Sequence, residues 1–298
     1  MLISPELAET VAAIVDEGSL EGAARSLRIT PSAVSQRLRA LEAQLGRVLV
    51  VRSKPARPTE AGSVVVRLAR QYALLGHDVG VSLGLEGPGR MNVPIAVNAD
   101  SLATWLLPAL EPVTRTHDVS FELRREDEDR TADLLEAGAV MAAVTSQREP
   151  IAGCTVTPLG QVIYDAVATP GYLARWMPDG ITRAALGRGP LIDFDRADDI
   201  QSAWLRERGV DPQQPPRHYV PASEDYAAAV RLGLGWGMLP PQQSEPSIEA
   251  GLLVSLGRPR MRVPLYWQQW NLRSPLLSAI RDAVVSAAHA ALEAEAGA

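Results

Sequence analysis

The chain has a single cysteine, Cys154, in 298 residues, so it forms neither an internal disulfide bond nor a multi-cysteine metal site. Its four histidines are scattered, and none of them forms the HExxH pair of zinc proteases. No run of about 20 apolar residues occurs, and the amino terminus lacks the basic segment and apolar run of a secretory signal. These absences predict a cytoplasmic protein with no bound metal and no membrane partner.

The acidic net charge of −6 hides an uneven distribution along the chain. Residues 1–90 carry 11 basic and 9 acidic groups, whereas the remaining residues carry 18 basic and 26 acidic groups. A weakly basic module joined to an acidic body predicts two functions in about two domains. The total charge does not exclude a nucleic-acid partner, because phosphate contacts depend on charge within about 8 Å at physiological salt.

The first sixty residues predict three short helices. Ser4 is expected to cap the first, which stops at Gly18, and the second follows Ser19. The third runs from a cap at Thr30 to Gly46, with a proline in its first turn. Its inward stripe consists of Val34, Leu38, Leu41 and Leu45.

The opposite face of the third helix carries short or fork-shaped polar side chains, which suit base edges and phosphates in a DNA major groove. A tight connection at residues 28–30 makes the second and third helices a helix-turn-helix. Residues 48–52 predict a strand and residues 53–58 a turn, together a wing that contacts phosphate. The predicted DNA-binding residues are Thr30, Pro31, Ser32, Ser35, Gln36, Arg39, Arg52, Lys54 and Arg57. Spacing alone also allows an ordinary three-helix bundle with a polar outer face.

A longer helix is predicted after a cap at Thr59, with apolar residues at heptad spacing. The predicted dimerisation residues are Val65, Leu68, Tyr72, Leu75 and Val79. The pattern lasts only about two heptads, so a single amphipathic helix lying on its own domain is the alternative. Gly84 and the glycines of residues 87–89 end the helix and place a domain boundary near residue 88.

The acidic body predicts an α/β fold with mainly parallel strands, because short apolar runs alternate with helical patterns. The predicted strands are residues 93–97, 119–123, 140–145, 164–168, 191–194 and 265–270. Ligands of such sheets lie beyond the carboxyl ends of the strands, beside helix N-termini. The polar residues at these ends, and thus the predicted effector-binding residues, are Asn98, Asp100, Ser101, Asp127, Asp129, Thr145, Ser146, Asp193, Asp195, Ser223 and Glu224.

Carboxylates outnumber cations at these strand ends, which favours a cationic ligand whose own carboxylate is held by helix-start amides and hydroxyls. A basic amino acid meets both requirements. The alternative is that these acids are helix caps and solvated loop charges, which are common at first turns.

Several ordered segments carry a family resemblance. The amino-terminal ones are GSLEGAA at 18–24, TPSAVSQRL at 30–38 and TEAG at 59–62. In this order they resemble the DNA-binding domain of LysR-type transcriptional regulators. Further on, the chain reads VNADSLATWLLPAL at 97–110, HYVPASE at 218–224 and LGLGWGM at 232–238. These runs resemble the ArgP/LysG branch, regulators of basic amino acid export that sense lysine, arginine or both.

The resemblance implies a winged helix-turn-helix, a linker helix and a two-lobed α/β effector domain like that of periplasmic binding proteins. The implied boundaries are 1–58 for DNA binding, 59–88 for the linker and dimerisation helix, and 89–298 for the effector domain, with lobe I at about 90–161 and 268–298 and lobe II at about 162–267.

The implied activity is transcriptional regulation of an amino acid exporter gene, not catalysis, with lysine or arginine as effector and no other cofactor. The implied partners are double-stranded promoter DNA, further copies of the chain in a homodimer or homotetramer, and RNA polymerase. The alternatives are a LysR-type regulator of another small molecule and a solute-binding protein without a transcriptional role.

Overall fold

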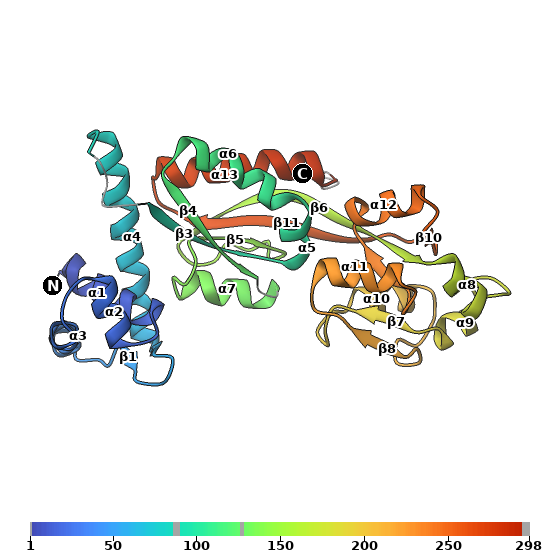
Figure 1. Ribbon diagram of the computed structural model, residues 1–298, viewed down its shortest axis with the longest axis horizontal. Helices are drawn as coiled ribbons and strands as arrows, with labels where there is room; N and C mark the ends of the chain where they lie inside the picture. The colour runs from blue at the N-terminus through green and yellow to red at the C-terminus, as the bar shows by residue number, and fades with distance from the viewer. Residues whose placement is uncertain (1, 86–89, 126–127, 294–298) are drawn as a thin grey trace. The chain divides into compact units, whose positions relative to one another are not determined.

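The computed structural model describes residues 2–85, 90–125 and 128–293, and the chain forms two compact units (Figure 1). The first contains residues 1–97, 111–157 and 267–283, and the second contains residues 98–110, 158–266 and 284–298. The division differs from the predicted lobes because residues 98–110 and 284–298 join the second unit. Their contacts explain this, since Asp100 bonds to Tyr164 and Ser223, and Glu293 pairs with Gln161.

The amino-terminal helices form where the sequence predicts them. They are α1 (Pro5–Asp16), α2 (Leu20–Ser26) and α3 (Pro31–Leu45). The hydroxyls of Ser19 and Thr30 accept hydrogen bonds from backbone N–H groups three residues later, at 3.0 and 3.2 Å. Gly46, with φ of 64°, ends α3 in the left-handed region. α1 begins directly after Ser4 as predicted, but the expected capping hydrogen bond of the Ser4 hydroxyl is absent.

A small antiparallel wing follows, formed by β1 (Val50–Val51) and β2 (Arg57–Pro58). It is shorter than the strand predicted at 48–52. The inward stripe of α3 is confirmed at Val34, Leu38 and Leu41, which are buried in one core with α1, α2 and the first turns of the next helix; Leu45 is half-buried against it. The wing and the three helices therefore form one structural domain.

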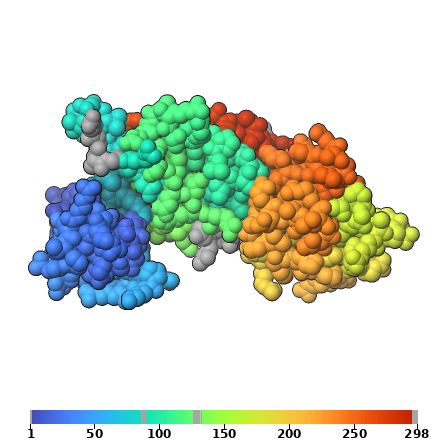
Figure 2. All heavy atoms as spheres, in the orientation of Figure 1, coloured from blue at the N-terminus to red at the C-terminus, as the bar shows by residue number. Residues whose placement is uncertain are grey.

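The linker helix is α4 (Glu60–Ser82), capped by Thr59, and Gly84 follows its end with φ of 65°. Val65 is buried in the core of its own domain, so it does not belong to the predicted dimerisation surface. Leu75 and Val79 are 41% and 58% exposed. In Figure 2 the carboxyl-terminal end of α4, in cyan, extends beyond the blue three-helix domain.

The rest of the chain is the α/β body. Its strands are β3 (Met91–Val97), β4 (Val119–Arg125), β5 (Ala142–Thr145), β6 (Cys154–Ala168), β7 (Leu191–Asp193), β8 (Arg217–Tyr219), β9 (Gly237–Leu239), β10 (Val254–Ser255) and β11 (Met261–Trp270). Its helices are α5 (Ala99–Ser101), the π-helical turn η1 (Leu102–Leu106), α6 (Leu107–Thr116), α7 (Glu128–Glu136), α8 (Pro170–Trp176), α9 (Arg183–Arg188), α10 (Ile200–Glu207), α11 (Ser223–Arg231), α12 (Pro241–Glu249) and α13 (Pro275–Ala291).

Strand pairing in the body is both parallel and antiparallel, so the prediction of mainly parallel strands is only partly confirmed. β3 pairs in parallel with β4 and β5, and β7 pairs in parallel with β8. β6 is much longer than the strand predicted at 164–168 and pairs antiparallel with β9 and β10, neither of which the sequence predicts. In the second unit α11 packs on β7 and β9 around a buried core (Figure 1). Among the described residues no helix is long and apolar enough to cross a membrane.

Candidate DNA-contacting surface and ligand site

The amino-terminal half of α3 presents a polar surface. Its exposed residues are Thr30, Pro31, Ser32, Gln36 and Arg39, and Ser35 is half-buried. Arg39 donates a hydrogen bond from Nε to the Ser35 carbonyl at 3.2 Å, which leaves its guanidinium near the start of the helix. The helix thus leaves the predicted base-contacting side chains outside the core of their own subunit.

The wing adds the basic part of this surface, because Arg52, Lys54 and Arg57 are all exposed. By contrast Arg37, on the same helix as the polar surface, forms an ion pair with Glu6 of α1. The direct contact of the α3 and wing residues with DNA remains a prediction of the sequence.

Asp100 is the centre of a polar cluster in the second unit. It lies in α5, directly after the carboxyl end of β3 and before the π-helical turn η1. Its Oδ1 accepts a hydrogen bond from the Ser223 hydroxyl and its Oδ2 accepts one from the Tyr164 hydroxyl, each at 2.6 Å. Among the described residues no cationic side chain forms an ion pair with Asp100. Within the part of the chain that the structure describes, the partners of this carboxylate are therefore neutral hydroxyls.

The electrostatics of Asp100 follow from its surroundings. Burial raises the pKa of this carboxyl, outweighing the opposing effect of the hydrogen bonds from Ser223 and Tyr164, and the nearby Asp198 carboxylate raises it further. A buried carboxylate without a positive partner is costly to ionise. A cationic ligand would supply the missing charge.

Gln243 of α12 completes the cluster. Its amide nitrogen Nε2 donates to the Ser223 hydroxyl at 3.0 Å and to Oε1 of Glu224 at 3.3 Å. Ser223 is 6% exposed and Gln243 is 9% exposed. Three of the predicted residues, Asp100, Ser223 and Glu224, are thus brought together.

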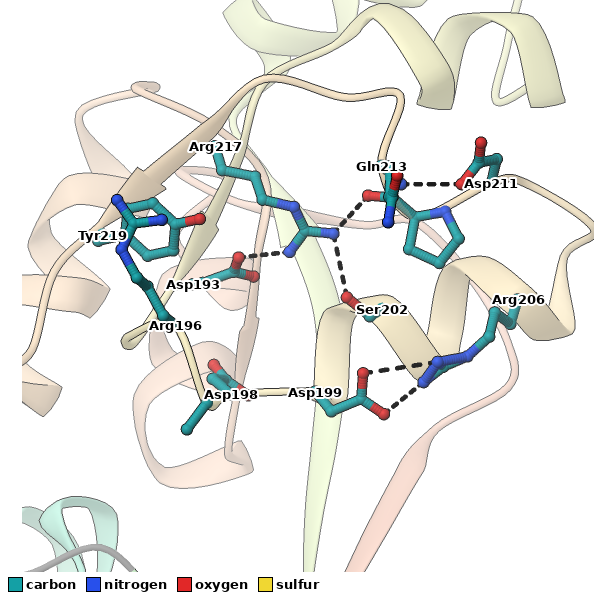
Figure 3. A pocket seen from close by; sticks show the side chains of 12 residues that line it. Asp193, Arg196, Asp198, Asp199, Ser202, Arg206, Asp211, Gln213, Arg217 and Tyr219 are labelled. Carbon is teal, nitrogen blue, oxygen red and sulfur yellow. Dashed lines mark hydrogen bonds and ion pairs between the residues drawn. The ribbon is translucent and has the colours of Figure 1, made fainter.

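A polar cavity of about 420 Å³ lies at the carboxyl ends of β7 and β8, apart from the Asp100 cluster (Figure 3). Arg217 forms an ion pair there with Asp193, and its guanidinium also donates to the Ser202 hydroxyl at 3.0 Å. Burial raises the pKa of Asp193 to about 6, although Arg217 opposes this shift. Because Asp193 already has an internal cation, it fits a cationic ligand less well than Asp100 does.

The other predicted effector residues have local roles or stand elsewhere. Asn98 Oδ1 caps α5 by accepting from the Ser101 N–H at 3.1 Å, and Asp195 Oδ1 accepts from the Ala197 N–H at 2.7 Å. These two match the alternative of caps and loop charges. The hydroxyl of Thr145, in the first unit with Ser146, accepts from the N–H of Gln147. Asp127 and the side chain of Asp129 lie outside the described residues.

The sequence missed Tyr164 and Gln243. Tyr164 lies at the start of the strand predicted at 164–168, and no motif there indicates a hydrogen bond from its hydroxyl to a carboxylate. Gln243 lies in a helix that was not predicted. Both contacts join segments far apart in the chain, so no local pattern reveals them.

Comparison with known proteins identifies the family. Residues 5–63 match the bacterial regulatory helix-turn-helix proteins of the lysR family, and residues 87–288 match the LysR substrate binding domain. The chain belongs to the LysR family of bacterial transcriptional regulators. This LysR-type regulator is 44% identical over 292 residues to the lysine export transcriptional regulatory protein LysG of Corynebacterium efficiens, covering 97% of this chain and 99% of the relative.

Solved structures agree with this assignment. ArgP from Mycobacterium tuberculosis is 41% identical to this LysR-type regulator, with a TM-score of 0.87 over 99% of this chain and all of that one. Full-length LysG from Corynebacterium glutamicum with bound effector Arg is 39% identical, with a TM-score of 0.78 over 98% of this chain and 100% of that one. The predicted family, fold class and regulatory rather than enzymatic function are confirmed.

Proposed function

We propose that this regulator binds lysine or arginine at the Asp100 cluster and thereby controls the promoter of an amino acid exporter gene. The observation that carries the proposal is the partly buried Asp100 carboxylate, bonded to two neutral hydroxyls and to no cation among the described residues. The names of its relatives support the same ligand class, since one is a lysine export regulator and another holds arginine as effector. The protein acts in the cytoplasm on promoter DNA, with RNA polymerase as the further partner.

Calorimetric titration of the purified regulator tests the ligand. Lysine and arginine are compared with norleucine and citrulline, which keep the backbone carboxylate and amine but lack the side-chain charge. Binding of the two cations and not of the neutral analogues is the expected result. Equal affinity for citrulline and arginine would contradict a site built around Asp100 while leaving the LysR assignment intact.

Regulation requires that the ligand favour one arrangement of the oligomer over another, since only differential affinity shifts an equilibrium. Such coupling is typically about 1–3 kcal/mol. A gel shift on the DNA upstream of a neighbouring exporter gene, with and without the ligand, measures it. A solute-binding protein without a transcriptional role would retard no DNA at all.

Substitutions on α3 and on the wing should have different effects on DNA binding. We expect Gln36→Ala or Ser35→Ala to weaken binding to the specific site by about 1–3 kcal/mol for each lost base contact, with little change on random DNA. Arg57→Ala should instead weaken binding to both and flatten the salt dependence, because phosphates carry no sequence information. Fluorescence anisotropy on specific and scrambled duplexes separates the two, and equal losses on both for Gln36→Ala would contradict its role.

The exposed side of α4 is proposed as the contact between subunits. Leu75 and Val79 lie one turn apart and are exposed in the single chain. Replacing both by aspartate should raise the dimer dissociation constant at least about 100-fold, because each buried side chain contributes roughly 1.5–3 kcal/mol. Sedimentation equilibrium measures this. Ala73→Asp, also exposed on α4 but on a different side, is the matched control, and an equal effect there would refute the proposed contact.

A further inference from the structure

Gln243 has an amide oxygen for which the protein provides no donor. Oε1 of this side chain is buried and has no hydrogen-bond partner among the described residues. The residue itself is only 9% exposed. A buried acceptor without a donor loses its bonds to water and gains nothing in return.

The orientation of this amide is decided by chemistry and is not an arbitrary assignment. Glu224 Oε1 can only accept a hydrogen bond, so the group that faces it at 3.3 Å must be the NH₂. The Ser223 hydroxyl uses its one hydrogen in the bond to Asp100, so it too accepts from the Gln243 NH₂. Exchanging the amide oxygen and nitrogen would place the amide oxygen, an acceptor, against these two acceptors. Oε1 therefore points away from both Glu224 and Ser223.

The amide group that carries this oxygen is one hydroxyl away from the proposed cation site. Ser223 Oγ is 2.6 Å from Asp100 Oδ1 and 3.0 Å from Gln243 Nε2, so one hydroxyl connects the carboxylate to the amide. Ser101 follows Asp100 in the sequence, and Ser244 follows Gln243. Both have buried hydroxyl oxygens without a partner among the described residues. The π-helical turn η1 follows Ser101 directly, and such turns occur frequently at functional sites.

We infer that Gln243 is a specificity-determining residue, whose carbonyl oxygen accepts an N–H from the charged end of the ligand beside Asp100. This inference rests on the proposed function, because it names a second contact at the same site. A cation with several N–H donors, whether guanidinium or ammonium, bonds to the carboxylate and to the amide oxygen together. A neutral side chain of the same length cannot compensate the carboxylate and gains little from the amide alone.

Two substitutions separate this role from a purely structural one. Gln243→Met removes both polar atoms at similar length, whereas Gln243→Glu keeps an acceptor oxygen and removes the NH₂ that holds Ser223 and faces Glu224. If the oxygen binds the ligand, Gln243→Met weakens binding of arginine or lysine about 10- to 100-fold, as expected for the loss of one hydrogen bond to a charged group. Gln243→Glu binds them within a few-fold of the wild type or more tightly.

Calorimetry of the full chain with arginine, lysine and citrulline, together with thermal unfolding of each variant, completes the test. Equal losses of affinity in the two variants would show that the NH₂ matters and would overturn the inference, as would an unchanged affinity in Gln243→Met. If Gln243→Met fails to fold, the prediction for Gln243→Glu decides alone, because a structural amide would make that variant bind weakly too. A wild-type protein that binds neither arginine nor lysine would refute the proposed function itself, which is a distinct outcome.

Discussion

Replacing Asp100 by asparagine is expected to weaken the binding of lysine and arginine by about 150- to 5,000-fold, because a buried cation left without its anionic partner costs about 3–5 kcal/mol. The substitution keeps the size of the side chain and an acceptor oxygen for the Ser223 or Tyr164 hydroxyl. Calorimetric titration measures the loss. Asp225→Asn, an exposed carboxylate in the first turn of α11 in the same unit, is the control and should bind as the wild type does.

The same variant should change the pH dependence of binding. Burial raises the pKa of Asp100 above its ordinary value of 3.8, so protonation competes with the cationic ligand at a higher pH than it would at an exposed carboxylate. Affinity of the wild type should therefore fall as the pH is lowered through the raised pKa, and this dependence should disappear in Asp100→Asn.

The stability of the ligand-free protein should depend on pH in the opposite sense to the ligand affinity, falling as the pH rises. A carboxyl whose pKa is higher in the folded state than in the unfolded state binds more protons when folded, so its ionisation destabilises the fold as the pH rises. Asp100→Asn removes this effect and should melt at or above the wild-type temperature at neutral pH. A variant that melted lower and still bound arginine normally would show that Asp100 is a structural residue.

Gly62→Ala should be the most destabilising small substitution in the amino-terminal domain. A Cβ atom at this position of α4 would lie 1.9 Å from the carbonyl oxygen of Leu49. This oxygen belongs to the backbone, so the clash cannot be relieved by a change of side-chain rotamer. Either α4 or the segment leading into the wing must move. We expect a loss of at least about 3 kcal/mol, the upper end of the cost of overpacking a core.

The matched control lies in the same helix. A Cβ at Gly80 meets nothing within 4 Å, so Gly80→Ala should stabilise the helix by roughly 0.5–1 kcal/mol. Urea denaturation followed by circular dichroism compares the two variants, and gel shifts report whether each still binds DNA. Similar stabilities for both variants would disprove the close approach of α4 to Leu49.

Local signals were sufficient for the DNA-binding half of the molecule. The caps at Ser19 and Thr30 and the left-handed Gly46 lie next to the helices they delimit, so their effect is written within a few residues. The local errors are small: the Ser4 hydroxyl makes no capping bond although a proline follows it, and the wing strand is shorter than predicted. Local patterns were not sufficient for the linker helix. Its apolar repeat does not distinguish Val65, which is buried in its own subunit, from the exposed Leu75.

The α/β body was less predictable from local patterns. Strands β8, β9 and β10 are only two or three residues long, too short to carry a periodicity, and they exist because a neighbouring strand pairs with them. β9 begins at Gly237, the last residue of the glycine-rich run 233–237. The earlier residues of this run, 233–235, form a turn and a bend, and pairing with β6 begins only at Gly237.

The sequence alone predicts a helix-turn-helix, a linker helix, an α/β body and a set of acids at the strand ends. These features depend on caps and periodicity, which involve residues close together in the chain. Only the tertiary structure distinguishes those acids. It places Arg217 beside Asp193 and gives Asp100 two neutral hydroxyls from distant segments. The charge that a ligand must bring depends on contacts between segments far apart in sequence, and such contacts come into being only when the chain folds.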